Sequence, residues 1–371
     1  MTANRPAPPS VDLVRRTTDR RVTDALITSA SLTRPEIASL VGISKPTVSE
    51  SIRRLTERGL IDEAGITTGG RGRASRRYRL SDDIGVGLAV YAGPLEVVAE
   101  VVDVRGEVRT RATRPIGLTA TPRQLSAILR SLLAECEAAA PGPVVARVVS
   151  VADPVDREGR TLAMESSPFL TAPADLRRSV GGDALIGNDV NWAALAELTD
   201  GAGERLNSFL YLYLGSGLGS AIVDEGRVVV GGQGLAGEIA YTLTRGPGGR
   251  GMSLLHCFRE LEFTVGSSTV IDADAVRAAF AAGDPRTEAL VTALAGSLGS
   301  SACMLSPDRI VVGGPWAGAP GLIPRLAAAT EQMVPYAVPV SAAEHSDGAA
   351  LAGARIAAAD AVRAALHRAV A

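Results

Sequence analysis

Apolar and capping residues divide the first sixty positions into separate helices. Apolar side chains at helical spacing predict a helix or a helix pair over residues 11–30. Thr33-Arg34-Pro35-Glu36 is a capping box with proline in the first turn, so a helix begins there and ends at Gly42. Ser44 as N-cap, with proline two residues later, begins another helix that runs to about Arg58. Two short helices joined by a glycine-containing turn match the helix-turn-helix pattern, in which the second helix enters the major groove.

A β-hairpin is predicted directly after these helices. Leu60 and Ile61 begin its first strand, Tyr78 and Leu80 end its second, and the tip reads "GGRGRASRR". Glycines let the tip approach a surface closely, and its arginines bring positive charge there. Helices and hairpin together predict a winged helix over residues 11–80, whose wing reaches phosphates or a narrow minor groove.

From residue 81 onward, short apolar runs alternate with alanine-rich helices. Strands are predicted at "GVGLAVYA", "EVVAEVVDV", "VVARVVSVA", "ALIGND", "SFLYLYL", "SAIVDEG", "RVVVGG" and "RIVVGG". Helices are predicted near residues 122–140, 191–202, 271–282, 286–305, 321–333 and 347–370. The alternation predicts an α/β architecture with mixed sheets. The length predicts two lobes, at 81–190 and at 191–371, with the C-terminal helix in the second.

The distribution of charge adds a functional indication to this outline. The 371 residues carry a formal net charge of -2. Residues 1–80 hold 15 basic and 8 acidic residues, which leaves 23 basic and 32 acidic residues for 81–371. A basic module on an acidic body favours a polyanionic partner, because phosphate neutralisation supplies most non-specific nucleic-acid affinity. The alternative is a chance fluctuation in a short segment.

Other features of the composition argue against several classes of protein. The Pro-rich stretch "MTANRPAPPS", residues 1–10, is expected to be a disordered lead-in. Cys136, Cys257 and Cys303 are too widely spaced for a disulfide framework or a paired metal site. No run of about 18 apolar residues and no basic-then-apolar leader is present, so we expect no membrane span and no secretory signal. The protein is therefore expected in the cytoplasm.

The helix that begins after Ser44 carries the predicted DNA-reading side chains. Lys45, in its first turn, is the only lysine among the 38 basic residues of the chain. A slim ammonium differs there from a planar guanidinium in how it meets base edges or phosphates. The alternative is that one lysine survived a bias toward arginine by accident. We assign DNA contacts to this helix and the wing, at Ser44, Lys45, Thr47, Ser49, Arg53, Arg54, Arg71 and Arg73.

The most informative segment of the body is residues 209–244, "FLYLYLGSGLGSAIVDEGRVVVGGQGLAGEIAYTLT". Gly215, Gly217 and Gly219 stand at alternate positions between two strands. Such glycines expose successive backbone N–H groups to an anion, as phosphate-cradling loops do. The same spacing occurs in a tight hairpin, so the motif alone leaves both interpretations open.

This segment resembles the ROK family of sugar kinases and sugar-responsive repressors, and the resemblance covers nearly the whole chain. "SSPFLTAPADLRRSVGGDALIGNDVNWAALAE" resembles the family stretch that ends in Asn-Asp before an alanine-rich helix. "LSPDRIVVGG" and "SDGAALAGA" resemble its adenosine-side strand and the start of its C-terminal helix. The resemblance implies a two-lobed actin-like ATPase (ribonuclease H-like) fold, with sugar and nucleotide in the cleft between the lobes. Together with the winged helix, it indicates the repressor branch.

The resemblance also implies that phosphoryl transfer is lost. The family's kinases hold phosphate and metal on an Asp-x-Gly-Gly-Thr turn, where this chain has Tyr91-Ala92-Gly93-Pro94-Leu95. Losing that carboxylate removes much of the positioning and charge neutralisation on which phosphoryl transfer depends. We therefore expect no catalytic residue, although Asp189 matches the family's catalytic base.

The same resemblance implies five effector-binding residues. Asn188 and Asp189 match the pair that hydrogen-bonds sugar hydroxyls, and Glu238 matches the glutamate of the Glu-x-Gly-His motif. Tyr241 takes the place of that motif's histidine, and Glu260 lies near the family's last sugar-binding glutamate, in a register uncertain by one residue. A phenol can still stack on a sugar face and form a hydrogen bond.

One departure and one alternative qualify that assignment. The family's zinc site uses three cysteines and the histidine, whereas only Cys257 could correspond here, so we expect no zinc and no other cofactor. Asn188 and Asp189 could instead simply cap a helix beginning near Trp192.

These observations predict a DNA-binding transcriptional regulator, a repressor, with a non-catalytic ROK domain. Its expected partners are a pseudo-palindromic double-stranded operator and a sugar-like effector between the lobes. It is expected to form a homodimer, or a dimer of dimers, that spaces two recognition helices one helical turn apart. The alternatives are a sugar kinase with an appended DNA-binding domain and a regulator that needs no effector. The sequence does not specify the operator, the effector or the regulated genes.

Overall fold

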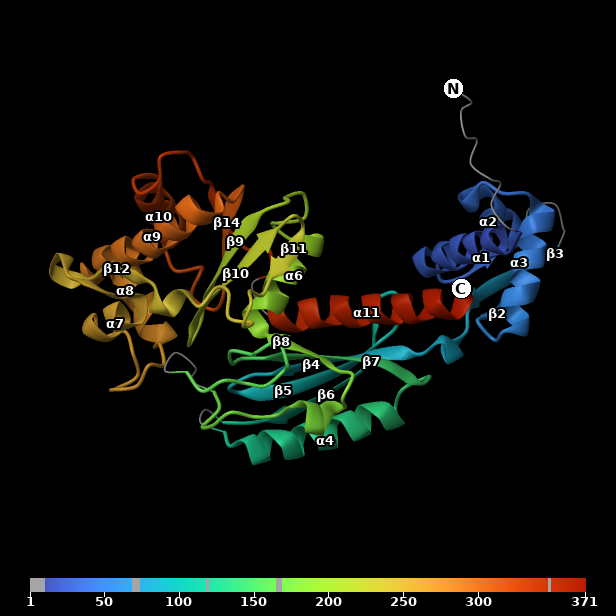
Figure 1. The fold of residues 1–371 in the computed structure, drawn as a ribbon, viewed down its shortest axis with the longest axis horizontal. Coiled ribbons are helices and arrows are strands. Elements are labelled where there is room, and N and C mark those ends of the chain that lie inside the picture. Colours follow the sequence, from blue (N-terminus) through green and yellow to red (C-terminus); the bar gives the residue numbers. More distant parts are fainter. Residues whose placement is uncertain (1–10, 69–73, 118–119, 165–168, 346–347) are drawn as a thin grey trace, which may run out of the picture.

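The computed structural model describes residues 11–68, 74–117, 120–164, 169–345 and 348–371. The predicted lead-in and the wing tip with Arg71 and Arg73 lie outside these described residues. Figure 1 shows a small N-terminal domain at one end of a long C-terminal helix, and two α/β lobes beside the rest of that helix.

The N-terminal domain is the predicted winged helix. Its elements are α1 (Val11–Thr28), β1 (Leu32–Thr33), α2 (Arg34–Val41), α3 (Lys45–Glu57), β2 (Ile61–Thr68) and β3 (Ala74–Leu80). The strands pair antiparallel in the order β1-β3-β2. The capping box is confirmed, since the backbone N–H of Thr33 donates to the Glu36 carboxylate at 2.7 Å and the Thr33 hydroxyl accepts from Glu36. Gly42 ends α2 in the left-handed region, with φ 66°, which glycine adopts without a Cβ clash.

The first lobe is built on a five-stranded sheet in the order β6-β5-β4-β7-β8. Its elements are η1 (Asp82–Ile84), β4 (Val86–Ala92), β5 (Glu96–Val102), β6 (Val108–Pro115), α4 (Pro122–Ala138), β7 (Val144–Val151), α5 (Arg177–Val180) and β8 (Leu185–Asn188). Strands β4, β7 and β8 run parallel, so their carboxyl ends meet at one edge of the sheet. Helix α4 covers one face and buries Leu125, Leu129 and Leu132 there.

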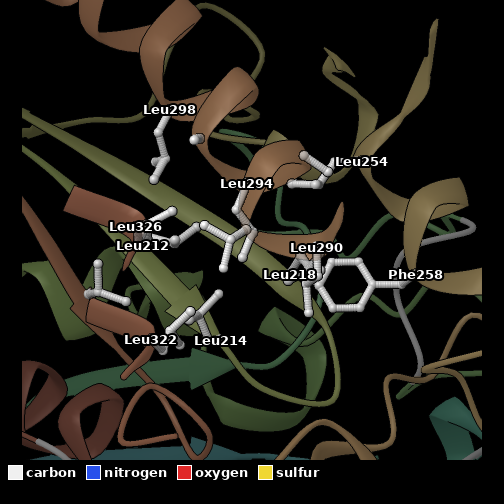
Figure 2. Packing of buried hydrophobic residues seen from close by; sticks show 14 of the residues in the cluster. Leu212, Leu214, Leu218, Leu254, Phe258, Leu290, Leu294, Leu298, Leu322 and Leu326 are labelled. Carbon is white, nitrogen blue, oxygen red and sulfur yellow. The ribbon is translucent and has the colours of Figure 1, made fainter. Parts of the chain in front are cut away.

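The second lobe repeats this plan with a sheet in the order β11-β10-β9-β14-β15. Its strands and short turns are β9 (Phe209–Leu214), β10 (Leu218–Asp224), β11 (Arg227–Val229), η2 (Ile239–Tyr241), β12 (Leu243–Arg245), η3 (Pro247–Gly249), β13 (Gly251–Ser253), β14 (Arg309–Gly313) and β15 (Val340–Ala342). Its helices are α6 (Asp189–Asp200), α7 (Leu254–Glu260), α8 (Ala273–Ala282), α9 (Arg286–Leu305) and α10 (Leu322–Glu331). Figure 2 shows leucines of β9, α9 and α10 interlocking in its core, with Phe258 of α7 beside them.

One helix among the described residues, α9, is long and apolar enough to cross a membrane by length and composition. Half of that apolar segment is buried inside the protein. Leu290, Leu294 and Leu298 point into the core of the second lobe (Figure 2). Such burial is what a core helix of a folded domain shows.

The C-terminal helix α11 (Ala349–Val370) packs differently from the sequence-based assignment to the second lobe. Ala354 and Ala358 are buried against β4, β5 and β7, so α11 covers the second face of the first lobe's sheet (Figure 1). Gly353 lies so close to α6 that a Cβ there would sit 1.8 Å from the carbonyl oxygen of Trp192. Both sides of the helix are therefore buried, which explains why its sequence shows no clear apolar stripe.

The sequence analysis missed several short elements. Strand β6 has only one buried residue, Ala112, because it is the edge of the first sheet and turns arginines toward solvent. Strands β12, β13 and β15 have three residues each, and α5 has four. Segments this short carry too few residues to show a period. Helix α7 was missed as well, although Ser253 caps it.

Candidate functional site

The first turn of α3 presents the residues predicted to read DNA. The Ser44 hydroxyl is the N-cap and accepts the backbone N–H of Thr47 at 3.3 Å. The hydroxyls of these two residues also lie 2.7 Å apart. Lys45 is the first residue of α3, and its exposed side chain has no ion pair within the described chain. An unpaired cation at an exposed helix start is free to meet a phosphate or a base edge.

The two arginines of α3 have different surroundings. Arg53 is 55% exposed and pairs with Glu50 and Glu57 of the same helix. Arg54 is mostly buried and donates to Asp19 of α1, with its Nη2 atom 2.5 Å from Oδ1. Arg54 therefore stabilises the packing of α3 on α1, and we no longer assign it to the DNA contacts.

The hairpin strands hold further arginines in internal contacts. Arg76 pairs with Glu63 across the hairpin, and Arg77 donates to the Ser31 hydroxyl at 2.8 Å. The carboxylates of Glu63 and of Glu36, which lies 3.5 Å from Arg77, offset part of this positive charge. Arg71 and Arg73, assigned to DNA by the sequence, lie outside the described residues.

A cleft between the lobes is lined by residues from both sheets. The first lobe contributes Tyr91 from the end of β4 and Asp153 from the loop after β7. The second contributes Tyr213 from β9, Ser216 and Gly217 from the β9–β10 turn, and Glu238. This cleft lies at the carboxyl ends of the parallel strands, where α/β folds place their ligands.

Three of the five predicted effector residues line this cleft, namely Asn188, Asp189 and Glu238. Two do not. The structure does not place Tyr241 among the lining residues, and its side chain is 41% exposed. Glu260 pairs with Arg250 at 2.5 Å. Tyr241 ends the 239–241 turn and Glu260 lies beyond it, and the path of the chain there cannot be read from a motif alone.

Asn188 also caps a helix, as the alternative interpretation held. Helix α6 begins at Asp189 rather than near Trp192, and the Asn188 side chain accepts the Val190 N–H at 2.9 Å. Its amide nitrogen donates to the backbone oxygen of Asp153 at 3.1 Å. One side chain therefore both caps the helix and fixes a cleft loop.

Asp153 is a cleft residue that the sequence analysis missed. It is only 2% exposed, and neither carboxylate oxygen has a hydrogen-bond partner within the described ranges. Burial, with Asp189 adding repulsion, raises the pKa of Asp153 to about 8. The backbone N–H of Leu170 opposes that pKa shift without reaching hydrogen-bonding geometry. The sequence did contain one indication of this residue, because Asp153 is an acidic residue just after the apolar run that forms β7.

The neighbouring carboxyl groups are shifted in the same direction. Burial raises the pKa of Glu238 to about 7. Burial also raises the pKa of Asp189, and Glu238 adds to that increase. Among the described residues that line the cleft there is no Lys, Arg or His. The site therefore concentrates acceptors without a compensating cation.

The end of β4 is closed by an aromatic ring. Burial, with a smaller effect of Asp189, raises the pKa of Tyr91. The backbone folds over that ring, because a Cβ on Gly93 would lie 2.2 Å from the Tyr91 hydroxyl oxygen. The phenol thus occupies the turn in which the sequence resemblance expects a phosphate-holding carboxylate.

The glycine-rich segment forms a hairpin, which was the alternative to a phosphate cradle. Leu214 pairs with Leu218, so the three residues between them make the turn. A Cβ on Gly219 would lie 2.6 Å from a Val190 methyl carbon, so this glycine permits α6 to pack on β10. Gly217 and Gly219 still line the cleft.

The segment aligned with the family's zinc site packs as ordinary core. Cys257 is fully buried, and His256 is bound to Ser253, with Nδ1 3.0 Å from the hydroxyl oxygen. Within the described ranges, no group of three or more His, Cys, Asp or Glu side chains could hold a metal ion.

Comparison with known proteins finds two families along the chain. The ROK family profile matches residues 88–257, and the winged helix-turn-helix DNA-binding profile matches residues 15–62. A ROK family transcriptional regulator, described as a homolog of the E. coli Mlc protein, superposes with a TM-score of 0.65 over 96% of this chain and 98% of that chain. Its sequence is 18% identical, so the likeness concerns the fold. A ROK hexokinase from Thermus thermophilus has a TM-score of 0.57 at 25% identity, covering 74% of this chain and 97% of its own.

Curated relatives include both kinases and repressors. A beta-glucoside kinase of Listeria innocua is 29% identical over 173 residues, which is 41% of this chain and 56% of the kinase. A xylose repressor of Caldicellulosiruptor bescii is 23% identical over 217 residues, which is 57% of this chain and 54% of the repressor. The chain thus spans about half the length of these two relatives.

Proposed function

The chain belongs to the ROK family and carries an N-terminal winged helix-turn-helix domain, and from this premise we propose that it is a DNA-binding transcriptional regulator. We propose further that it acts as a repressor in the cytoplasm and that its ROK domain binds a sugar-like effector without phosphorylating it. A two-fold dimer would present two α3 helices to a pseudo-palindromic operator.

One arrangement carries this proposal. Helix α11 covers the sheet whose strand ends form the cleft, and its last turns enter the core of the winged helix. Val362, Leu366 and Val370 pack there with residues of α1 and α3. His367 binds Asp24 of α1, with Nε2 2.7 Å from Oδ1. A change in the cleft-bearing lobe can therefore alter the placement of the DNA-binding domain through one rigid element.

The residues that line the cleft favour a ligand-binding sensor over a kinase. Tyr91 fills the turn where the family's kinases hold phosphate and metal, and the described lining residues include no Lys or Arg to neutralise a nucleotide. Phosphoryl transfer relies on neutralising the charge of the nucleotide phosphates, whereas binding a sugar-like ligand does not.

DNA binding is tested by selecting an operator from a pool of random duplexes with the full-length protein. Lys45→Ala is expected to alter the preferred sequence as well as the affinity, because Lys45 stands where α3 meets base edges. Arg71→Ala with Arg73→Ala is expected to weaken binding and to reduce the salt slope by about one to two. The matched control is Arg178→Ala, an arginine of the first lobe whose side chain is 87% exposed.

Two results would overturn this part of the proposal. One is wild-type protein that ignores every duplex at low ionic strength. The other is operator binding by the Lys45 and wing variants that equals wild type in both affinity and sequence preference.

A kinase function is the second candidate, favoured by the retained Asp189 and by kinase relatives such as that of Listeria innocua. A coupled assay of ATP consumption over a panel of sugars decides between them. Turnover that disappears in Asp189→Asn would establish the kinase. The regulator proposal expects no turnover in either protein.

A further inference from the structure

The inter-lobe cleft has an excess of hydrogen-bond acceptors that the protein itself does not satisfy. Asp153 Oδ1 and Oδ2 are buried without a partner among the described residues, and so is Asn191 Oδ1 in its assigned amide orientation. Asp153 and Asn191 both line the cleft. Buried polar atoms in folded proteins nearly always have a partner, so an orphaned group in a cleft indicates a missing ligand.

The position of Asp153 is built into the fold. The loop that carries it follows β7, and the Asn188 side chain holds its backbone oxygen at 3.1 Å. The next residue is Pro154, which fixes the backbone φ angle directly after the carboxylate. The backbone that carries this carboxylate is thus restrained from two sides.

We propose that the effector of this cleft carries a protonated amine, which Asp153 binds together with Asn191 and Asp189. This inference rests on the proposed function, since it specifies the chemistry of the effector. The ligand class is a polyhydroxylated primary amine, such as an amino sugar. An ammonium group offers three N–H donors and no acceptor, which matches the three orphaned oxygens.

The electrostatics of the cleft favour a cation over a neutral or anionic group. Asp189 is close enough to raise the pKa of Asp153, and Glu238 acts in the same way on Asp189. A cation bound among these carboxyl groups attracts each of them and so offsets their mutual repulsion. Its charge also lowers their pKa values toward the ordinary range. Tyr91 and Tyr213 are also among the lining residues, and aromatic side chains attract ammonium groups.

A neutral sugar is the rival occupant. Each of its hydroxyls brings an acceptor as well as a donor, and although those donors could reach the orphaned oxygens, a neutral sugar would leave the charge of the carboxyl groups unbalanced. In that case the cleft would prefer no amine over the corresponding alcohol, and the charge of Asp153 would not matter.

Isothermal titration calorimetry at pH 7 on the full-length protein tests the proposal with matched pairs of probes. The pairs are glucosamine and glucose, galactosamine and galactose, mannosamine and mannose, and 6-amino-6-deoxyglucose and glucose. We expect at least one amine to bind about tenfold or more tightly than its partner alcohol. Asp153→Asn, which keeps the shape and removes the charge, is expected to reduce that ratio to about twofold or less.

The control variant is Glu158→Gln, which removes the same charge from an exposed side chain of the same loop. It is expected to keep the wild-type ratio. Equal or tighter binding of the alcohols, or a ratio unchanged in Asp153→Asn, overturns the amine proposal and leaves a sugar-sensing regulator standing. If no probe binds while the same preparation binds its selected operator, effector sensing itself fails, and the amine proposal fails with it.

Discussion

At the scale of single residues, the cleft carboxyl groups decide how stability depends on pH. Asp153 is buried with a pKa of about 8, whereas an unfolded chain ionises aspartate near pH 4. Below about pH 4 Asp153 is protonated in both the folded and the unfolded protein. As the pH rises, the unfolded state loses its proton first, so the folded state becomes progressively less stable until about pH 8.

Asp153→Asn is therefore expected to become more stabilising, relative to wild type, as the pH rises from 5 to 8. The side chain of asparagine does not titrate, so the difference in unfolding free energy between variant and wild type should grow by about 2–4 kcal/mol. Urea unfolding at the two pH values measures it. Glu158→Gln should show no such trend, and a difference that is constant with pH would contradict the assignment of a raised pKa.

A second residue-scale prediction concerns the buried carboxylate of α1. Asp19 is 4% exposed and accepts from the Ser51 hydroxyl at 2.5 Å and from Arg54. Asp19→Asn removes the buried counter-ion of the Arg54 guanidinium and leaves only the Glu50 carboxylate, 3.5 Å from Nη1. We expect a loss of about 2–3 kcal/mol in unfolding free energy, below the full cost of breaking a buried pair because Arg54 is partly exposed.

Hydrogen exchange in α3, together with urea unfolding, measures that loss. The matched control is Asp12→Asn on the same helix, whose 78% exposed side chain pairs with Arg15 at 3.6 Å. Its effect should stay within about 0.5 kcal/mol, since exposed ion pairs contribute little. Wild-type exchange rates in α3 of the Asp19 variant would show that Arg54 does not anchor this helix.

At the scale of elements, α11 has two separate packing surfaces. Its first part fills the space between the first sheet and α6, where Gly353 allows the two helix backbones to approach closely. Its last turns belong to the winged-helix core. Arg58 donates to the carbonyl oxygens of Ala369 and Val370 at the end of the helix. The DNA-binding domain is therefore completed by the far end of the chain.

Leu366→Ala tests this sharing of core residues. The side chain is 1% exposed, and truncating a buried leucine costs about 2–5 kcal/mol through lost transfer energy and a residual cavity. Hydrogen exchange should accelerate in α1 and α3 while the sheet of the second lobe keeps its protection. Leu185→Ala, at a 52% exposed position of the first lobe, serves as the control. Unchanged exchange in α1 and α3 would contradict the shared core.

At the scale of the whole molecule, the packing of α11 on both the first lobe and the winged helix predicts how effector binding and DNA binding affect each other. If an effector changes operator affinity by some factor, operator DNA must change effector affinity by the same factor. In Leu366→Ala the cleft residues are untouched, so effector affinity without DNA should stay near the wild-type value. The coupling factor should fall toward one. Titrations of each ligand in the presence and absence of the other measure it, and full coupling in this variant would exclude α11 as the connecting element.

The sequence by itself determined most of the local structure. The capping box at 33–36, the helix stop at Gly42 and the hairpin strands depend on contacts between near neighbours in the chain. Hydrophobic periodicity over short windows likewise indicated the main strands and helices of both lobes. Such features follow from backbone geometry and nearby hydrogen bonds, which a linear pattern contains.

Only the tertiary structure decided which distant residues meet. In the folded protein Arg54 bonds to Asp19, and Asp153 lies beside Asp189. Tyr241 and Glu260 are not among the residues that line the cleft. The tertiary structure also placed α11 against the sheet of the first lobe and in the winged-helix core, as well as on α6 of the second lobe. The physical reason is that burial and long-range pairing depend on how all the elements pack at once, and no short stretch of sequence contains that information.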